Sequence, residues 1–154
     1  MYESTEIVGL AYHVSVGFHI SPKVSVHGGY LSMIDGQGAT VLSGLDASSR
    51  LFLFSNGSTI DVEGDGKRIV QSSLFTHYLL IGYKLRELAA EETKPQYSGF
   101  NLGYGCNWYL GRSFKWNYAK DFFVNPEFDS GNLKSPTGNS SRNSNFSLGF
   151  GTLF

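Results

Sequence analysis

Five side chains near the N-terminus have the types and spacing of a hydrolytic or metal-binding group: His13, Ser15, His19, Ser25 and His27. A histidine in hydrogen-bond contact activates a serine as a nucleophile, and histidine is a common metal ligand. No acidic residue lies near them in the sequence to orient a histidine as base. Three interpretations follow: a serine hydrolase, a metal site at His19 and His27, or a hydrogen-bonded interior network. The sequence favours the network.

The segment that carries these side chains alternates strictly between apolar and small or polar residues. The apolar set is Val8, Leu10, Tyr12, Val14, Val16, Phe18 and Ile20, and the intervening residues are glycine, alanine, histidine and serine. Successive side chains of a strand project to opposite faces. A soluble barrel needs bulky apolar side chains inside, so this pattern predicts an apolar surface that points outward into lipid.

The same pattern recurs at residues 100–110, 114–124 and 146–154, with only Lys120 on the apolar side. A chain of 154 residues is long enough for about eight membrane-crossing strands of about ten residues each. We therefore predict a single domain, residues 1–154, that is all-β and forms an antiparallel up-and-down transmembrane β-barrel of about eight strands. In a sandwich the face opposite the core would carry exposed charges, but here it carries Gly, Ser, Asn and His.

Turn signals divide the chain. Strands at residues 7–20 and 24–34 form a predicted hairpin around Ser21-Pro22-Lys23, with Ile20 facing Val24 and His19 facing Ser25. Residues 35–68 contain a turn at 35–38, short strands at 50–54 and 59–63, a hairpin signal at Asn56-Gly57 and a turn at 64–66, whereas 40–45 fits a strand or a loop. Residues 69–85 are a predicted strand, Gly111-Arg112 a tight turn, and 86–96 and 125–145 loops.

The remaining candidates favour structural roles. Asp61, Glu63 and Asp65 resemble the opening of a calcium loop, but Ser72 occupies the position of the required bidentate acid, so a solvated turn is expected. Cys106 is expected to behave as a small hydrophobe. Interior charge pairs or packing are expected for Lys84, Lys115 and Asp121. Aromatic girdles at the bilayer interfaces are expected from Tyr12, Tyr30, Trp108, Trp116 and Tyr118. The Asn-x-Ser sequons at Asn56, Asn139 and Asn145 would carry no meaning if the source is bacterial.

Composition limits the class further. Only 16% of residues are charged, the net charge is −1 and 19 residues are glycine. The chain thus lacks a basic footprint for nucleic acid, and its single cysteine excludes an internal disulfide framework. No apolar run reaches about 18 residues. The first ten residues lack the basic and hydrophobic parts of a signal peptide, which predicts a processed form, a piece of a larger protein, or a chain that is not exported.

The ending SLGFGTLF resembles the C-terminal strand of bacterial outer-membrane β-barrels, which alternates apolar residues and ends in Phe. The stretches GLAYHVSVGFHISPKVSVHGGYLSM, HYLLIGYKL and KPQYSGFNLGYGCNWYLG resemble small outer-membrane barrel proteins of the Bacteroidetes. The resemblance implies a periplasmic C-terminus with short turns on that side. It would place 125–145 outside and 111–112 inside. A count of eight strands also places Ser21-Pro22-Lys23 outside, where a short turn is unusual.

The expected function is that of a non-enzymatic outer-membrane protein with a structural, adhesive or partner-binding role, or a subunit of a larger envelope complex. Its expected partners are outer-membrane lipid, lipopolysaccharide and other envelope proteins, with its variable function in the loops at 86–96 and 125–145. No catalytic, cofactor-binding or metal-binding residue is predicted. The alternatives are a lipid-modifying hydrolase of the outer membrane, which some small barrels are, and a soluble small-ligand-binding β-barrel.

Overall fold

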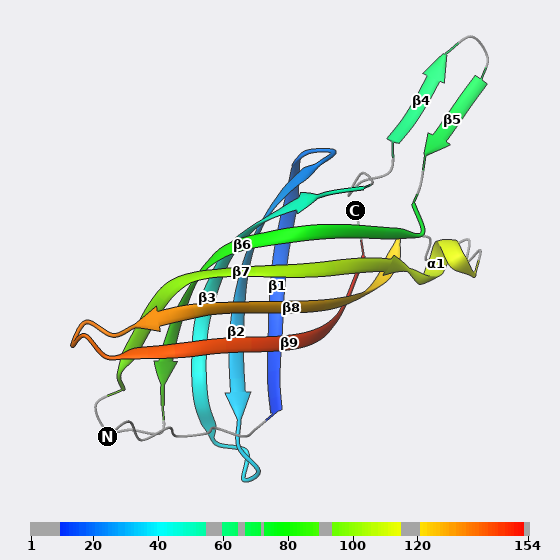
Figure 1. The fold of residues 1–154 in the computed structure, drawn as a ribbon. Coiled ribbons are helices and arrows are strands. Elements are labelled where there is room, and N and C mark those ends of the chain that lie inside the picture. Colours follow the sequence, from blue (N-terminus) through cyan, green and yellow to red (C-terminus); the bar gives the residue numbers. More distant parts are fainter. Residues whose placement is uncertain are drawn as a thin grey trace.

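A computed structural model describes residues 10–54, 60–64, 67–71, 73–89, 94–114 and 121–152, with the backbone alone for 60–71. Seven strands form one antiparallel sheet (Figure 1). In spatial order they are β1 (Leu10–Ser21), β2 (Val24–Ile34), β3 (Thr40–Phe52), β6 (Phe75–Leu88), β7 (Gln96–Tyr109), β8 (Phe122–Lys134) and β9 (Ser140–Thr152). A separate hairpin, β4 (Ile60–Gly64) and β5 (Lys67–Gln71), joins β3 to β6, and the short helix α1 (Leu110–Ser113) follows β7.

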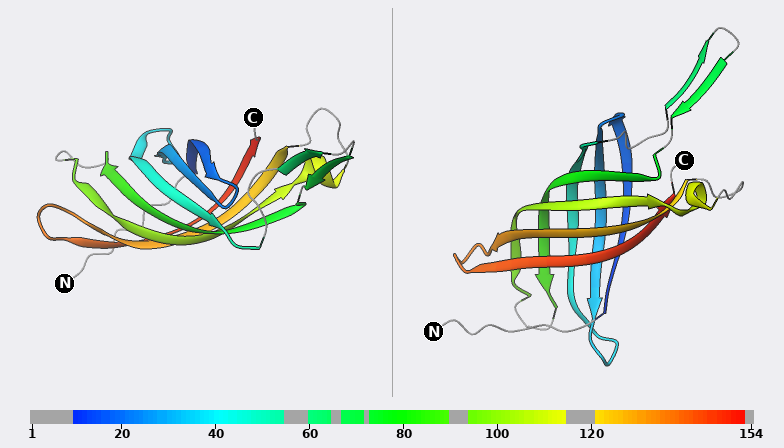
Figure 2. Two further views of the ribbon diagram at one scale, coloured as in Figure 1. Left: turned by 90° about the horizontal axis from the view of Figure 1, so that it is seen from above. Right: turned by 45° about the vertical axis from the view of Figure 1, so that its right-hand side comes forward.

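The sheet curves into a half-barrel, which Figure 2 shows as an open trough. Each strand pairs with its neighbour in the antiparallel sense. Strands β1 and β9 are the two edges of the sheet. The described residues contain no helix that is long and apolar enough to cross a membrane.

The two ends of the half-barrel differ in their connections. One end, here called the hairpin end, carries the Pro22-Lys23 turn, the β4–β5 hairpin, α1 and the last residue of β9. The other end, here called the turn end, carries the β2–β3 and β8–β9 turns and the β6–β7 connection. The longer connections therefore lie where β9 ends.

Two turns at the turn end share one construction. Gly38 and Gly138 have φ of +84° and +88°, which favours glycine. The amide of Gly38 donates to the carbonyl of Asp35, and the amide of Gly138 donates in the same way to Ser135. The side chain of Asp35 also accepts the amides of Gln37 and Ala39 at 2.8 and 2.9 Å. A glycine at positive φ thus sets both reversals, and the Asp35 side chain stabilises the first.

Several predicted boundaries were wrong. The sheet contains seven strands, whereas about eight were predicted. Because the number is odd, the Ser21-Pro22-Lys23 turn lies at the end of the sheet where β9 finishes. Residues 125–145 are not a loop but belong to the paired strands β8 and β9 and the five-residue turn between them, 135–139. Backbone hydrogen bonds between the two strands stabilise them, although their polar side chains do not show the alternation typical of a strand. Of the predicted loop at 86–96, residues 86–88 and 96 belong instead to β6 and β7, which pair out to Glu87 and Gln96.

The region after β7 also differs from the prediction. Gly111-Arg112 lies within α1 rather than in a tight turn, and Phe114, where a strand was predicted to begin, follows α1 outside any strand. Residues 115–120 of that predicted strand lie outside the described residues, and β8 begins at Phe122. Residues 40–45, which fitted a strand or a loop, belong with 50–52 to the single strand β3. Residues 69–85 fall into two strands, β5 and β6. The hairpin signal at Asn56-Gly57 lies outside the described residues.

The first hairpin was predicted correctly, and so was the alternation at residues 100–108 and 146–150. The His19–Ser25 pairing is confirmed, whereas Val24 pairs with Ser21 rather than Ile20 because the register shifts at that point. Residues 100–108 and 146–150 carry their apolar side chains on the exposed face of β7 and β9.

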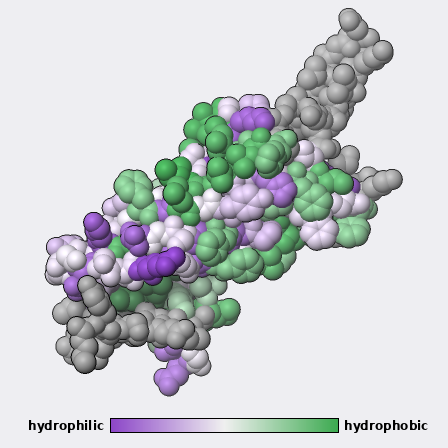
Figure 3. All heavy atoms as spheres, in the orientation of Figure 1, coloured by the Kyte–Doolittle hydropathy of each residue, from purple (hydrophilic) through white to green (hydrophobic). Residues whose placement is uncertain are grey.

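Burial in the described residues is the reverse of that in a soluble globular domain. Twenty-six large hydrophobic residues are exposed, whereas the buried set contains six hydrophobic and nine polar or charged residues. On β1 the exposed ones are Leu10, Tyr12, Val14, Val16, Phe18 and Ile20. Figure 3 shows hydrophobic residues over the middle of the sheet and hydrophilic ones toward the β8–β9 tip. The convex face is apolar and the concave face polar.

Candidate functional site

The candidate site is the polar concave face, here called the inner face. Strand alternation brings charged side chains from four strands onto it: Asp46 and Arg50 of β3, Lys84 and Arg86 of β6, and Glu127 and Asp129 of β8, with His13 of β1 beside them. The three cations and three carboxylates balance. Asp46 and Arg86 pair between the neighbouring strands β3 and β6, whereas the other three ion pairs join strands that are not adjacent and cross at least one intervening strand.

The most buried pair is that of Lys84 and Asp129, whose residues are 5% and 3% exposed. The ammonium donates to the Asp129 carboxylate across β7. The residue of β7 opposite Asp129 is Gly103, and a Cβ at that position would overlap the Asp129 side chain. Glycine on the middle strand therefore makes room for a bridge between β6 and β8.

A second bridge follows the same rule. Tyr78 of β6 and Glu127 of β8 both face Gly105 of β7, and the Tyr78 hydroxyl crosses that glycine to donate to Glu127 at 2.7 Å. A Cβ at Gly105 would overlap the tyrosine ring. The carboxylate also accepts from Arg50 at 2.8 Å, and the Arg50 guanidinium lies 4.6 Å from the centre of the Tyr78 ring. The Asn125 amide donates to the tyrosine hydroxyl at 2.6 Å.

A third bridge starts from β1. His13 reaches across Gly29 of β2 to the Asp46 carboxylate, with the Nε2 to oxygen distance at 3.3 Å. Asp46 also pairs with Arg86 at 2.6 Å. The sequence search found no acid near the histidines because Asp46 comes from β3, two strands away in the sheet.

The structure joins two of the five candidate side chains directly. Ser25 and His27 are in contact, with the hydroxyl 2.8 Å from Nε2, and the His27 ring lies over Gly17 of β1. His19 packs near Phe52, with ring centroids 5.5 Å apart. Ser15 is exposed on β1. Hydrogen-bonded polar side chains therefore line the inner face, although of its charged members only Lys84 was named from the sequence.

The Ser25–His27 contact has the donor and acceptor of a nucleophile–base pair but lacks other parts. Ser25 is only 1% exposed, so its hydroxyl is closed to a substrate. The inner carboxylates are engaged elsewhere, Asp46 with His13 and Arg86, Glu127 with Arg50, and Asp129 with Lys84. A buried serine without an orienting acid can hold the histidine in place but does not form a complete triad.

No cluster of three or more His, Cys, Asp or Glu side chains able to hold a metal ion occurs within the described side chains. The side chains of the calcium-like segment 61–65 are not among them. Of the predicted interior charges, Lys84 lies on the inner face, Asp121 pairs with Arg112, and Lys115 lies outside the described residues.

The charged inner residues could have been found in the sequence from their period of two. In β6 the inward positions follow the period of two from Thr76 to Arg86, opposite to the apolar set. In β8 the same period places Asn125, Glu127 and Asp129 inward. The prediction of a loop at 125–145 removed that second set from consideration.

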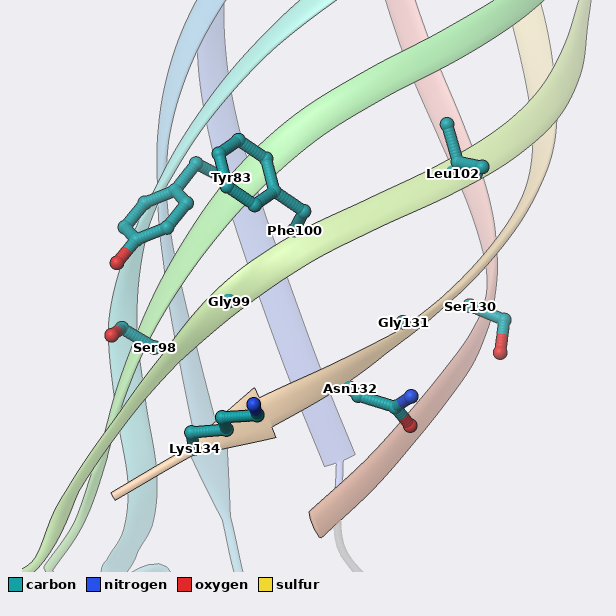
Figure 4. Close-up of a pocket in the computed structure, with 9 residues that line it drawn as sticks. All are labelled: Tyr83, Ser98, Gly99, Phe100, Leu102, Ser130, Gly131, Asn132 and Lys134. Carbon is teal, nitrogen blue, oxygen red and sulfur yellow. The ribbon is translucent and has the colours of Figure 1, made fainter. Parts of the chain in front are cut away.

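The convex face carries a shallow groove between β7 and β8 with a volume of about 600 Å³ (Figure 4). Its apolar part is formed by Tyr83, Phe100 and Leu102, and polar side chains, Asn132 and Lys134 among them, line the part toward the turn end. The Tyr83 and Phe100 rings meet edge to face at 5.1 Å. The groove therefore combines an apolar wall with one cationic side chain, that of Lys134.

The fold and the site define an antiparallel half-barrel with an apolar outer face and a charge-balanced inner face. A scan against models of protein families, a search of curated proteins and a search of solved structures each gave no match.

Proposed function

We propose that this protein is an integral β-barrel of a bacterial outer membrane with a non-enzymatic structural, adhesive or partner-binding role. The observation that carries the proposal is the reversal of polarity across the sheet. Monomeric soluble proteins rarely expose contiguous apolar patches above roughly 600 Å², yet the outward side chains of β1 alone form six successive exposed apolar positions. Hydrocarbon is the solvent that matches such a face.

The height of the apolar band supports the proposal. On β6 it extends from Phe75 to Leu85, and ten steps of about 3.4 Å at a tilt of about 40° rise about 26 Å. Outer-membrane barrels carry an apolar band about 25 Å tall with aromatic girdles. Tyr12 and Tyr30 lie outward toward the turn end, and Trp108 lies outward toward the hairpin end.

Lipid and lipopolysaccharide are the proposed contacts of the outer face. The groove between β7 and β8 offers Phe100 and Leu102 to acyl chains and Lys134 to an anionic headgroup. It lies where the outward residues change from apolar Phe128 to polar Ser130, which is where a bilayer interface would fall. The proposed partner-binding element is the β4–β5 hairpin, because it projects away from the sheet (Figure 1).

Folding in and out of detergent tests the proposal. The chain should gain β-sheet circular dichroism and a heat-modifiable shift in gel mobility only in micelles or vesicles, because water does not solvate its apolar outer face favourably. A chain that is monomeric and equally folded in plain buffer would instead be the soluble small-ligand-binding barrel, and the membrane proposal would fall.

The second candidate is a lipid-modifying hydrolase, favoured by the 2.8 Å contact between Ser25 and His27. It requires access to a hydroxyl that is buried. Mass spectrometry of lipid A from cells that express the wild type or Ser25→Ala separates the two candidates. Identical acylation supports the non-enzymatic role, and loss of a deacylated species only in the variant supports the hydrolase.

A further inference from the structure

The open side of the half-barrel lies between β1 and β9, here called the seam. Seven consecutive antiparallel strands alternate in direction, so β1 and β9 run the same way. A barrel in which every neighbouring pair is antiparallel needs an even number of strands. Direct pairing of β1 with β9 would be parallel, so an antiparallel closure requires an odd number of further strands.

The two edges have the length and exposure of strands that await a neighbour. They contain 12 and 13 residues. Strand β6, inside the sheet, alternates buried and exposed residues, whereas β1 is exposed on both faces over almost its whole length. Unpaired backbone N–H and C=O groups cost several kcal/mol each in hydrocarbon. An unfilled seam is therefore incompatible with insertion into a bilayer.

Other occupants fit the seam poorly. Two copies that share one orientation in a membrane bring β1 of one copy beside β9 of the other, and these strands are parallel. Residues 1–9 are too short to fill the seam, because a tight turn uses at least two of them and leaves at most seven against the twelve of β1, and residues 153–154 are shorter still.

We propose that the seam binds one extended strand of a second polypeptide, which pairs antiparallel with β1 on one side and with β9 on the other. This inference rests on the proposed membrane function, because only a bilayer makes the free edges prohibitive. It identifies the partner by its chemistry, as a strand added by backbone hydrogen bonds.

The neighbouring residues specify that strand. Its outward side chains continue the apolar band between Val14 and Val16 of β1 and Phe146 and Leu148 of β9. Its inward side chains are small or polar and uncharged, because the three inner cations and three inner carboxylates already pair. A length of about twelve residues matches the two edges.

A synthetic peptide tests the seam with residues 1–154 folded in zwitterionic micelles. The probe is a blocked 12-residue peptide that alternates Leu, Val or Tyr with Ser, Thr or Gly. The control has the same composition with its apolar residues grouped in one half. Hydrogen exchange read by mass spectrometry should slow at least tenfold in both β1 and β9 with the probe, and remain unchanged in β3 and β6. The control peptide should leave all four strands unchanged.

Cysteine cross-linking supplies the second readout. In a Cys106→Ser background, Ser15→Cys is combined with Ser141→Cys or Ser147→Cys, all on the inner face. A strand between β1 and β9 separates them by about 10 Å, beyond the roughly 7 Å limit of a disulfide between Cα atoms. A bismaleimide should therefore link the pair when the probe is bound, whereas oxidation should not.

Four results would overturn the inference: protection of only one edge, no protection by the probe, a disulfide between β1 and β9, or protected edges in a dimer or monomer without peptide. Failure of the membrane proposal is seen separately, as folding in plain buffer. The exchange experiment needs no variant, so misfolding of a cysteine mutant leaves it decisive.

Discussion

The buried pair of Lys84 and Asp129 offers the most direct test of the inner face. Removing one partner of a buried ion pair leaves an uncompensated charge, which typically costs 3–5 kcal/mol. Lys84 and Asp129 are only 5% and 3% exposed. We therefore expect Lys84→Met and Asp129→Asn each to lower the free energy of unfolding by about 3 kcal/mol.

The double variant gives the sharper result. Lys84→Met with Asp129→Asn leaves no uncompensated charge, so the double variant should cost no more than either single change, and the magnitude of the coupling free energy should be at least about 3 kcal/mol. Asp121→Asn is the matched control, because Asp121 pairs with Arg112 but its side chain is 42% exposed. That change should cost less than about 1 kcal/mol.

The assay is urea unfolding of protein refolded into short-chain phosphatidylcholine vesicles, followed by tryptophan fluorescence and by the folded band on unheated gels. Single variants that each cost under about 1 kcal/mol and add without coupling to within about 0.5 kcal/mol would refute the reasoning. The pair would then be solvated, and the inner face would be an aqueous surface rather than a packed interior.

Three further perturbations test separate parts of the structure. Gly105→Val should displace the Tyr78 ring and destabilise the sheet by about 2 kcal/mol or more in the same urea assay, and full stability would show that the ring does not cross β7. Cys106 points outward from β7 among exposed apolar residues, so a charged maleimide should label it at least tenfold more slowly in vesicles than in urea; equal rates would place it in water. Replacing residues 55–73 by a short Gly-Ser linker should change stability by less than about 1 kcal/mol, because β4 and β5 form their own sheet and loop closure depends weakly on length; loss of the heat-modifiable band would contradict that independence.

The sequence predicted the strands whose outward face is apolar and missed those whose two faces are both polar. On β1 and β7 the alternation of large and small residues is strict, and the structure follows it. Toward the turn end, β8 and β9 carry serine and asparagine on both faces, as at Ser130, Asn132, Ser144 and Asn145. Their order comes from pairing with each other, which is a non-local property that periodicity cannot reveal.

The polar character of the candidate site was predictable from the sequence, but most of its charged residues were not. The inward histidines and serines of β1 and β2 were found because they interrupt a clear apolar alternation. Asp46, the charged partner of His13, was missed because the order of strands in the sheet brings it there from β3, and Glu127 of β8 reaches Arg50 of β3 in the same way. The glycines were visible in number, but their use as crossing points needs the register.

The charge bridges and the glycines together explain the curvature of the sheet. Each bridge ties two strands that are separated by at least one other, so it shortens the concave side and bends the intervening strand outward. Glycine at the crossing point allows this, as Gly103 does beneath Asp129 and Gly105 beneath Tyr78. The inner ion pairs extend from β1 to β8. Strand β9 holds its place through its ladder with β8, so curvature enforced by charge ends one strand before the seam. A strand that fills the seam therefore completes the barrel by backbone pairing and outward apolar contact, the two interactions that β9 already uses.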